Sequence, residues 1–181
     1  MYPPFEKLVT NLDLEINRLS ADEIEAHPKG DSARWSIRQI VEHLVLTYRL
    51  SGANLQDRLR KARATKYRAT WTQVSTRFVV LKVGYFPPGR LAPAAVTPSA
   101  EPAERRDGIQ LAAFFASELE AMDSTLSACE VHFGGRVFAT HQVLGPLSAV
   151  QWRRFHVIHA HHHLRHIHKL IQKLDWVMAR N

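Results

Sequence analysis

The sequence predicts an all-α protein, a four-helix bundle with a long crossover between the second and third helices. Apolar residues recur three and four positions apart in four segments, the spacing of a buried helix face. A Pro/Ala-rich stretch, residues 87–108, separates the second segment from the third and holds five of the nine prolines. With 181 residues, the chain has the length of one ordinary domain. We therefore expect a single domain, 1–181, whose crossover is irregular over about residues 84–108.

The first helix is predicted to begin after Pro3 and Pro4, because proline is tolerated in the first turn of a helix. A short helical turn is expected at 21–26. The second long helix begins after Ser36, which forms an S-x-x-Q capping box with Gln39, and runs to about residue 63. The buried face of the first helix is expected to be formed by Phe5, Leu8, Leu12, Ile16 and Leu19.

The segment 67–85 is ambiguous, because its centre, Phe78 to Val83, is rich in β-branched residues. A strand and a helical segment packed against the bundle both remain open for it. After the Pro/Ala-rich stretch, Asp107 is expected to cap the third helix. The buried face of that helix should be formed by Leu111, Phe115, Leu119, Met122 and Leu126.

The segment 131–146 is expected to be a loop or a hairpin, and the last helix follows it. Ser148 and Gln151 form a second capping box at its start, and neither proline nor glycine interrupts the chain from there on. A purely up-down bundle needs only short connections. The long crossover therefore favours a second and third helix that run parallel to each other.

Composition excludes several classes of protein. A hydrophobic content of 45% and a charged content of 23% exclude a mainly disordered chain. Cys129 is the single cysteine, so neither an intrachain disulfide nor a cysteine-rich metal site is available. The N-terminus lacks the pattern of a signal peptide, and the apolar stretches are too short to span a bilayer. We expect a cytoplasmic protein with no membrane partner.

Histidines carry the strongest functional signal. Seven of the eleven lie within residues 156–168. At about 100° per residue, His159, His163 and His166 share the face of the apolar residues, whereas His161 and His168 point away from it. His162 is expected on the flank.

Three of these histidines fit one metal site. His159 and His163 are one helical turn apart, a spacing that lets two imidazoles bind one ion. His43 is a polar residue in the buried stripe of the second helix and supplies a third nitrogen. Three neutral imidazoles leave a coordination position for water or substrate. The alternative is that these are hydrogen-bonded core histidines. His156 and His166 are candidates to orient the ligands or line the pocket.

Two motifs resemble the DinB/YfiT-like superfamily. Residues 35–44, WSIRQIVEHL, are similar to its second-helix motif, and residues 141–170 to the fourth-helix signature of an uncharacterised bacterial branch, roughly HPxxGxLSxxxWxxxHxxHxxHHLRQ. Gln142 and His166 depart from that signature, where it tends to have proline and glutamine. The positions in register are Trp35, Ser36, His43, His141, Gly145, Leu147, Ser148, Trp152, His156, His159, His162, His163, Leu164 and Arg165.

The resemblance implies a four-helix bundle with a divalent metal ion bound by His43, His159 and His163. Zinc and nickel are the expected ions, although three imidazoles also suit cobalt, iron and copper. Characterised members of the superfamily include metal-dependent transferases that use low-molecular-weight thiols and a thiol-dependent isomerase of a ring-cleavage product. The branch itself implies no particular activity.

We therefore expect a metal-dependent enzyme that acts on a small molecule, either a thiol-dependent transferase or a hydrolase. The substrate is expected to be anionic or a low-molecular-weight thiol. Its pocket would be roofed by segments 67–108 and 129–147, with His141 and Trp152 nearest the ligand, although Trp152 also fits a core position. No general base is identified among Glu42, Glu118 and Asp123.

The alternative is a non-catalytic protein that binds metal or anions. The chain has a formal net charge of +7, and six cations lie between residues 58 and 68. Such a run can bind phosphate or nucleic acid, but no recognised nucleic-acid fold accompanies it, and it also fits a solvated helix end. Nucleic acid is therefore not the expected partner. The oligomeric state stays open, a homodimer included. The cations are Arg58, Arg60, Lys61, Arg63, Lys66 and Arg68.

Overall fold

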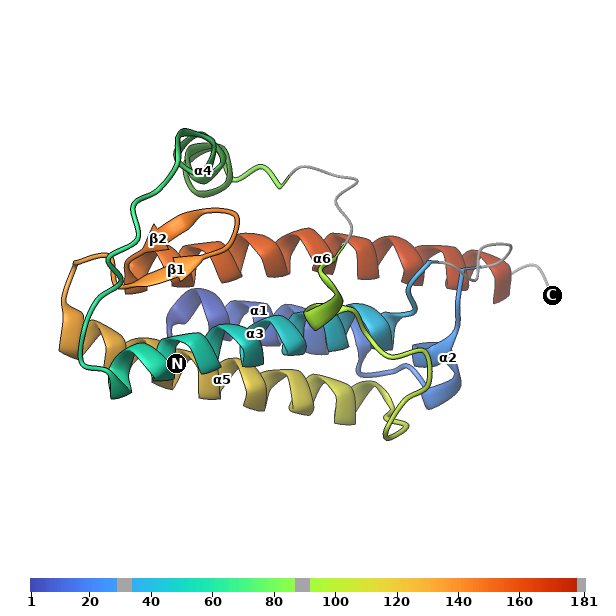
Figure 1. The fold of residues 1–181 in the computed structure, drawn as a ribbon. Coiled ribbons are helices and arrows are strands. Elements are labelled where there is room, and N and C mark those ends of the chain that lie inside the picture. Colours follow the sequence, from blue (N-terminus) through green and yellow to red (C-terminus); the bar gives the residue numbers. More distant parts are fainter. Residues whose placement is uncertain (29–33, 87–91, 179–181) are drawn as a thin grey trace.

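Four long helices lie side by side in the computed structural model, which describes residues 1–28, 34–86 and 92–178 (Figure 1). The predicted all-α bundle is confirmed. The long helices are α1 (Pro3–Ile16), α3 (Ile37–Arg60), α5 (Gly108–Phe133) and α6 (Ala149–Met178). The shorter elements are α2 (Ala21–Glu25), α4 (Trp71–Phe78), the π-helical turn η1 (Val79–Val83), the 3-10 turn η2 (Ala94–Val96), and strands β1 (Ala139–His141) and β2 (Gly145–Leu147).

Helices α3 and α5 run in the same direction, and α1 and α6 run opposite to them (Figure 1). The parallel arrangement expected from the long crossover is therefore confirmed. Helix α5 packs more extensively on α3 than on any other element. The start of α5 is fixed against the end of α1, because the N–H of Gly108 donates to the carbonyl of Leu19 over 2.9 Å. A Cβ at Gly108 would lie 1.7 Å from the carbonyl oxygen of Ile16, so only glycine fits there.

The predicted apolar stripes form the core. Phe5, Leu8, Leu12 and Ile16 of α1 are all fully buried. The capping boxes at Ser36 and Ser148 are present, and Asp107 accepts a hydrogen bond from the N–H of Gln110. The stripe of α5 is also buried, as predicted: Leu111, Phe115, Leu119, Met122 and Leu126.

Three predicted boundaries differ from the structure. Helix α1 begins at Pro3, so both prolines lie inside its first turn, where their missing N–H groups cost nothing. Helix α3 ends at Arg60 rather than near residue 63. The crossover is less irregular than expected over 84–108, because η2 packs on α3. Part of that segment, residues 87–91, lies outside the described residues.

The ambiguous segment 67–85 is helical. A capping box of Thr70 and Gln73 starts α4, and the β-branched residues after Phe78 continue it as the π-helical turn η1. Gly84 ends this turn with a φ of 75°, a conformation that favours glycine. The strand alternative for this segment is therefore wrong.

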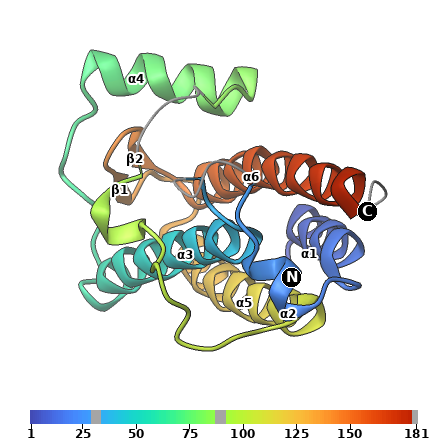
Figure 2. The same ribbon diagram turned by 90° about the vertical axis from the view of Figure 1, so that its right-hand side faces the viewer.

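Helix α4 stands apart from the bundle and packs on the hairpin formed by β1 and β2 (Figure 2). Gln73 donates to the carbonyl of Gln142 over 3.0 Å, and Arg77 to that of Pro146 over 2.9 Å. Trp71 and Phe78, by contrast, are 88% and 62% exposed. This helix thus turns polar side chains inward and apolar side chains outward.

The segment 131–146 contains the hairpin that was one of its two predicted forms. Strands β1 and β2 are antiparallel, with Thr140 opposite Pro146. Asn54 of α3 donates to the carbonyl of Thr140 over 3.2 Å and thereby holds the hairpin at the end of the bundle. None of the helices in the described part of the chain combines the length and the hydropathy needed to cross a membrane.

Candidate metal centre

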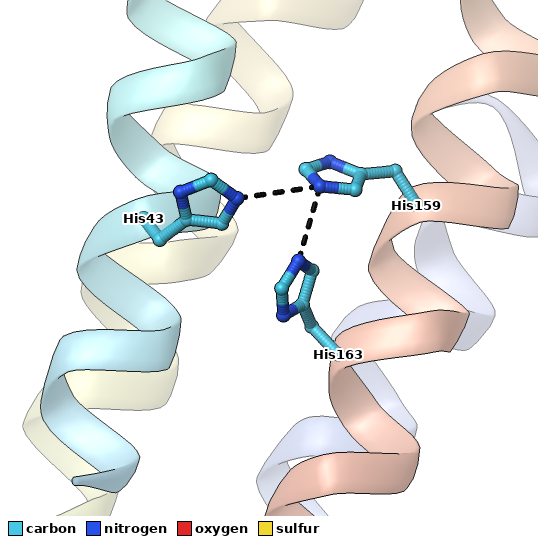
Figure 3. Close-up of side chains that lie close together, drawn as sticks. All are labelled: His43, His159 and His163. Carbon is cyan, nitrogen blue, oxygen red and sulfur yellow. Dashed lines mark hydrogen bonds between the residues drawn. The ribbon is translucent and has the colours of Figure 1, made fainter. Parts of the chain in front are cut away.

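Three histidine side chains converge between α3 and α6 (Figure 3). His43 lies on α3, and His159 and His163 lie one turn apart on α6. All three are at least 92% buried, with exposed fractions of 5%, 5% and 8%. The Nε2 atom of His159 lies 3.3 Å from Nε2 of His43 and 3.1 Å from Nε2 of His163. The structure thus brings together the three residues that the sequence predicted; we call them the triad.

The spacing of the triad nitrogens suits a single metal ion. Two imidazole nitrogens that each bind one ion at about 2.1 Å lie about 3.0–3.4 Å apart when the angle at the ion is about 90–110°. The two observed contacts fall within that range. The three ligand atoms all lie within 4.8 Å of one another. In the part of the chain that the structure describes, no carboxylate joins this group.

The tautomer of His43 is fixed by the crossover. Its Nδ1 lies 2.7 Å from the carbonyl oxygen of Val96 in η2. A carbonyl can only accept, so Nδ1 carries the hydrogen and Nε2 presents a lone pair to the triad. The indole of Trp35 lies against the same imidazole, with ring centroids 5.1 Å apart. A hydrogen bond from the nitrogen that faces away from the ion to a carbonyl, like the bond from Nδ1 of His43 to Val96, is typical of metal-binding histidines.

A polar network holds this part of the crossover on α3. Glu42 accepts hydrogen bonds from the N–H of Ser99 over 3.1 Å and from its hydroxyl over 2.9 Å. Arg38 pairs with Glu42 and donates to the carbonyl of Ser99 over 3.0 Å. Glu42 therefore fixes the backbone that orients His43 and does not face the triad nitrogens. Sequence analysis missed Val96 because its role belongs to a main-chain carbonyl, which no residue type signals.

Burial keeps the triad imidazoles uncharged. Burial lowers the pKa of His163 to about 2, with a further contribution from the neighbouring His43. Burial, and then the proximity of His163, lowers the pKa of His159 well below its ordinary value. Burial also lowers the pKa of His43, although the bond to Val96 opposes the shift. Three neutral rings therefore converge, and a cation between them would relieve the repulsion of their lone pairs.

The second nitrogens of His159 and His163 are also informative. Neither Nδ1 atom has a hydrogen-bond partner in the described structure, although both are buried. Buried polar atoms without partners are unfavourable, and proteins retain them chiefly where another role requires them. The donor set is consequently one that fits a divalent metal ion.

Comparison with known families gives a match that covers most of the chain. Residues 5–167 match the family model of the DinB superfamily. The chain belongs to the DinB superfamily. Searches of curated proteins and of solved structures found no match. The DinB superfamily is associated with metal binding, and the triad of this member could hold a metal ion.

His156 and Trp152 lie in the core of this DinB-like bundle, next to the triad. His156 is fully buried between Trp152 and Tyr48, with ring centroids 5.8 and 5.4 Å away. Neither of its ring nitrogens has a hydrogen-bond partner in the described structure, and burial lowers its pKa to about 3. Trp152 is 2% exposed, which agrees with the second of its two predicted roles, a core position. Phe155 stacks on His159, with ring centroids 5.5 Å apart.

His141 lies in the hairpin, one aromatic ring away from the triad. Its Nδ1 accepts hydrogen bonds from the N–H groups of Val143 and Leu144, at 3.1 and 3.2 Å. Its ring contacts Phe155, with centroids 4.5 Å apart, and Phe155 in turn stacks on His159. The role of His141 in the structure is thus to hold the turn of the hairpin. Its contact with a ligand stays a prediction.

His166 is exposed, although its helical phase predicted an inward direction. Its ring lies 5.8 Å from that of His163 but is left exposed, so the prediction that it faces the core is wrong. Phase gives the direction of a side chain and not whether another element covers it. His161 and His168 are exposed, as expected, and His168 bonds Glu15 over 2.9 Å.

A hollow of about 280 Å³ lies beside α6, lined by Gly84, Ile158, His161 and Arg165.

The remaining candidate groups serve other contacts. Glu118 pairs with Arg49 over 2.5 Å. Asp123 is buried and accepts a hydrogen bond from Arg153 over 3.0 Å. In the basic run, Lys61 lies 2.6 Å from Asp57, to which Arg60 also bonds. Anion binding by this run stays a prediction.

Proposed function

We propose that this protein is a metal-dependent enzyme in which His43, His159 and His163 bind one divalent ion through their Nε2 atoms. The observation that carries the proposal is the convergence of three buried, neutral Nε2 atoms at contacts of 3.1 and 3.3 Å. Three protein ligands leave coordination positions free, which is typical of catalytic rather than structural metal sites. Zinc and nickel are the ions we expect.

The reaction we favour is the transfer of a thiol to a small electrophilic substrate. When bound, the ion would lower the pKa of a thiol or water that coordinates it. A free thiol has a pKa of about 8.5, so forming a thiolate beside a cation requires no further base. That matters here because Glu42 is committed to Ser99 and Arg38, and no carboxylate joins the triad in the described chain. Hydrolysis, the other candidate, has a greater need of such a base.

The substrate class follows from charge. Three neutral ligands would leave the full positive charge of the ion in the site, and the chain itself carries a formal net charge of +7. A small carboxylate or a low-molecular-weight thiolate would neutralise part of that charge. The rings of Trp35, Phe86 and Phe155 lie against triad imidazoles and would limit the access of water to them.

Elemental analysis of protein purified without an affinity tag is the first test, and one ion per chain is expected. The protein is then loaded with cobalt and titrated separately with glutathione, cysteine and acetate. A sulfur-to-cobalt charge-transfer band with the thiols would support thiol transfer. A response to acetate alone would favour the hydrolase, and a bound ion that responds to none of them would indicate a non-catalytic metal-binding protein.

A further inference from the structure

A second pair of histidines lies on α6, outside the triad. His162 and His166 are one helical turn apart, and their ring centroids are separated by 4.5 Å. The triad pair on the same helix, His159 and His163, has the same sequence spacing and a centroid separation of 4.7 Å. Two histidine pairs of matching geometry thus occupy one helix, one pair buried and the other at the surface.

The rings of the outer pair are accessible. His166 is exposed and His162 is half-buried. Within the described chain, neither ring makes a hydrogen bond, whereas His168 on the same helix bonds both Glu15 and Gln172. The ring nitrogens of the outer pair are therefore free to coordinate an ion.

The outer pair also adjoins the triad. The ring of His163 lies 5.2 Å from that of His162 and 5.8 Å from that of His166. Phe86 contacts both His159 and His162, with centroids 5.2 and 5.3 Å away. A continuous set of imidazoles therefore leads from the surface of α6 to the buried nitrogens.

We propose that His162 and His166 form an outer site for a divalent transition-metal ion, from which the ion passes inward to the triad. Two imidazoles one turn apart can bind one ion, and water would complete its coordination. Arg165 and Lys169 lie near these rings and repel a cation, so the outer site should bind more weakly than the triad. This difference in affinity would drive the ion inward. The transfer, though not the outer site, rests on the function proposed above for the triad.

Copper binding by a variant without the triad tests the outer site directly. Tag-free His43→Ala/His159→Ala/His163→Ala protein is titrated with Cu²⁺. Among the divalent first-row transition metals, this is the ion that imidazoles bind most tightly. Binding of one ion is expected. Adding His162→Ala and His166→Ala should weaken it at least about tenfold, because a two-histidine site loses both ligands. The matched control, His161→Ala/His168→Ala in the same background, should not.

Counting ions in the otherwise unchanged protein keeps the test valid should the triad-free variant fail to fold. The number of Cu²⁺ ions per chain should fall by one in His162→Ala/His166→Ala and stay constant in His161→Ala/His168→Ala. An equal number of ions in the His162→Ala/His166→Ala variant and the parent protein overturns the outer site.

The rate of cobalt loading tests the transfer. Rapid mixing of metal-free protein with Co²⁺, followed by visible absorption, should show loading about tenfold slower in His162→Ala/His166→Ala, because capture beside the triad raises the local concentration of ion. The equilibrium affinity of the triad should stay unchanged. An unchanged loading rate overturns the transfer. Absence of any cobalt signal from the parent protein would instead contradict the proposed function of the triad.

Discussion

Helices α6 and α4 both reverse the ordinary distribution of side chains, but in opposite senses. Helix α6 turns His156, His159 and His163 into the core. Helix α4 turns Trp71 and Phe78 to the outside and uses Gln73 and Arg77 for its contacts with the hairpin. Neighbouring helices cover the inward histidines of α6, whereas the outward apolar side chains of α4 face solvent.

The comparison shows that amphipathic periodicity and burial are separate properties. Both helices have a regular pattern, but only the surroundings decide which face is covered. A reversal also lowers stability relative to an ordinary pattern, so it marks a place where folding alone does not explain the residues. In α6 the three converging nitrogens suggest a metal ion as the reason. In α4 nothing in the structure explains the exposed face.

The largest effect should come from the inner histidines. Each of the single variants His43→Ala, His159→Ala and His163→Ala should reduce bound metal from one ion per chain to none, because two imidazoles make a weak site. His161→Ala and His168→Ala, on the outer face of the same helix, should bind as before. Elemental analysis after dialysis measures this. Stoichiometric metal in the His43→Ala/His159→Ala variant would refute the assignment of the ligands.

Replacing a buried histidine of α6 by an apolar residue should stabilise the metal-free protein. His159→Leu removes an unpartnered buried Nδ1 atom and an unfavourable approach of lone pairs, so a gain of about 1–2 kcal/mol in the free energy of unfolding is expected. The same variant should lose the stabilisation that one equivalent of metal provides through the triad, and a chelator should not change its melting temperature.

Urea denaturation and thermal melting of both proteins, with and without chelator, measure this effect. In the parent protein the chelator should lower the melting temperature at neutral pH. A metal-free His159→Leu protein less stable than its metal-free parent would show that the triad is a well-accommodated core cluster, and the comparison with α4 would then lose its basis.

Acid should destabilise the metal-free protein through His156. The pKa of this ring is about 3 in the folded state and about 6.5 in an unfolded chain, because burial disfavours its charged form. Its contribution to stability is therefore complete above about pH 6.5 and is lost progressively as the pH falls towards 3. The loss from this one group is limited to about 1.4 kcal/mol per pH unit.

Denaturation curves between pH 7 and pH 4 test the role of His156. The slope of stability against pH should be shallower in His156→Leu than in the parent protein. His168→Leu is the matched control, because His168 is exposed on the same helix. Equal slopes in His156→Leu and the parent protein would show that His156 does not stay neutral in the folded state.

The smallest effect is expected on α4. Trp71→Ser and Phe78→Ser remove side chains that are mostly exposed, so the free energy of unfolding should change by less than about 0.5 kcal/mol. Phe115→Ala, in the buried stripe of α5, should cost about 3–5 kcal/mol and serves as the control. A large loss of stability in Phe78→Ser would show that α4 packs more closely on the protein than its exposed face indicates.

The bundle and the triad were predictable because both depend on helical phase. His43 lies in the apolar stripe of α3, and the spacing of His159 and His163 is visible in the sequence. The long connection was enough to predict that α3 and α5 are parallel. Capping boxes gave the starts of α3 and α6, since a serine with a glutamine three residues later satisfies the first free N–H groups, and Asp107 gave the start of α5 as a single cap.

What the sequence missed depends on contacts between distant segments. The carbonyl of Val96 has no side-chain signal, and the exposure of His166 depends on what covers α6 rather than on its phase. Helix α4 was only one of two forms left open, because the β-branched residues after Phe78 also fitted a strand and the Thr70–Gln73 capping box was overlooked. The same spacing had been recognised at Ser36 and could have been recognised here.

The parallel pairing of α3 and α5 has a consequence for the kinetics of folding. Two helices that run the same way cannot meet through a short turn, so the chain between Arg60 and Gly108 must be spanned before their interface can form. Contacts between residues far apart in sequence carry an entropic cost of loop closure and slow the crossing of the folding barrier. Refolding after rapid dilution from denaturant should therefore be slower than in an up-down bundle of equal length, even though every element involved is a helix.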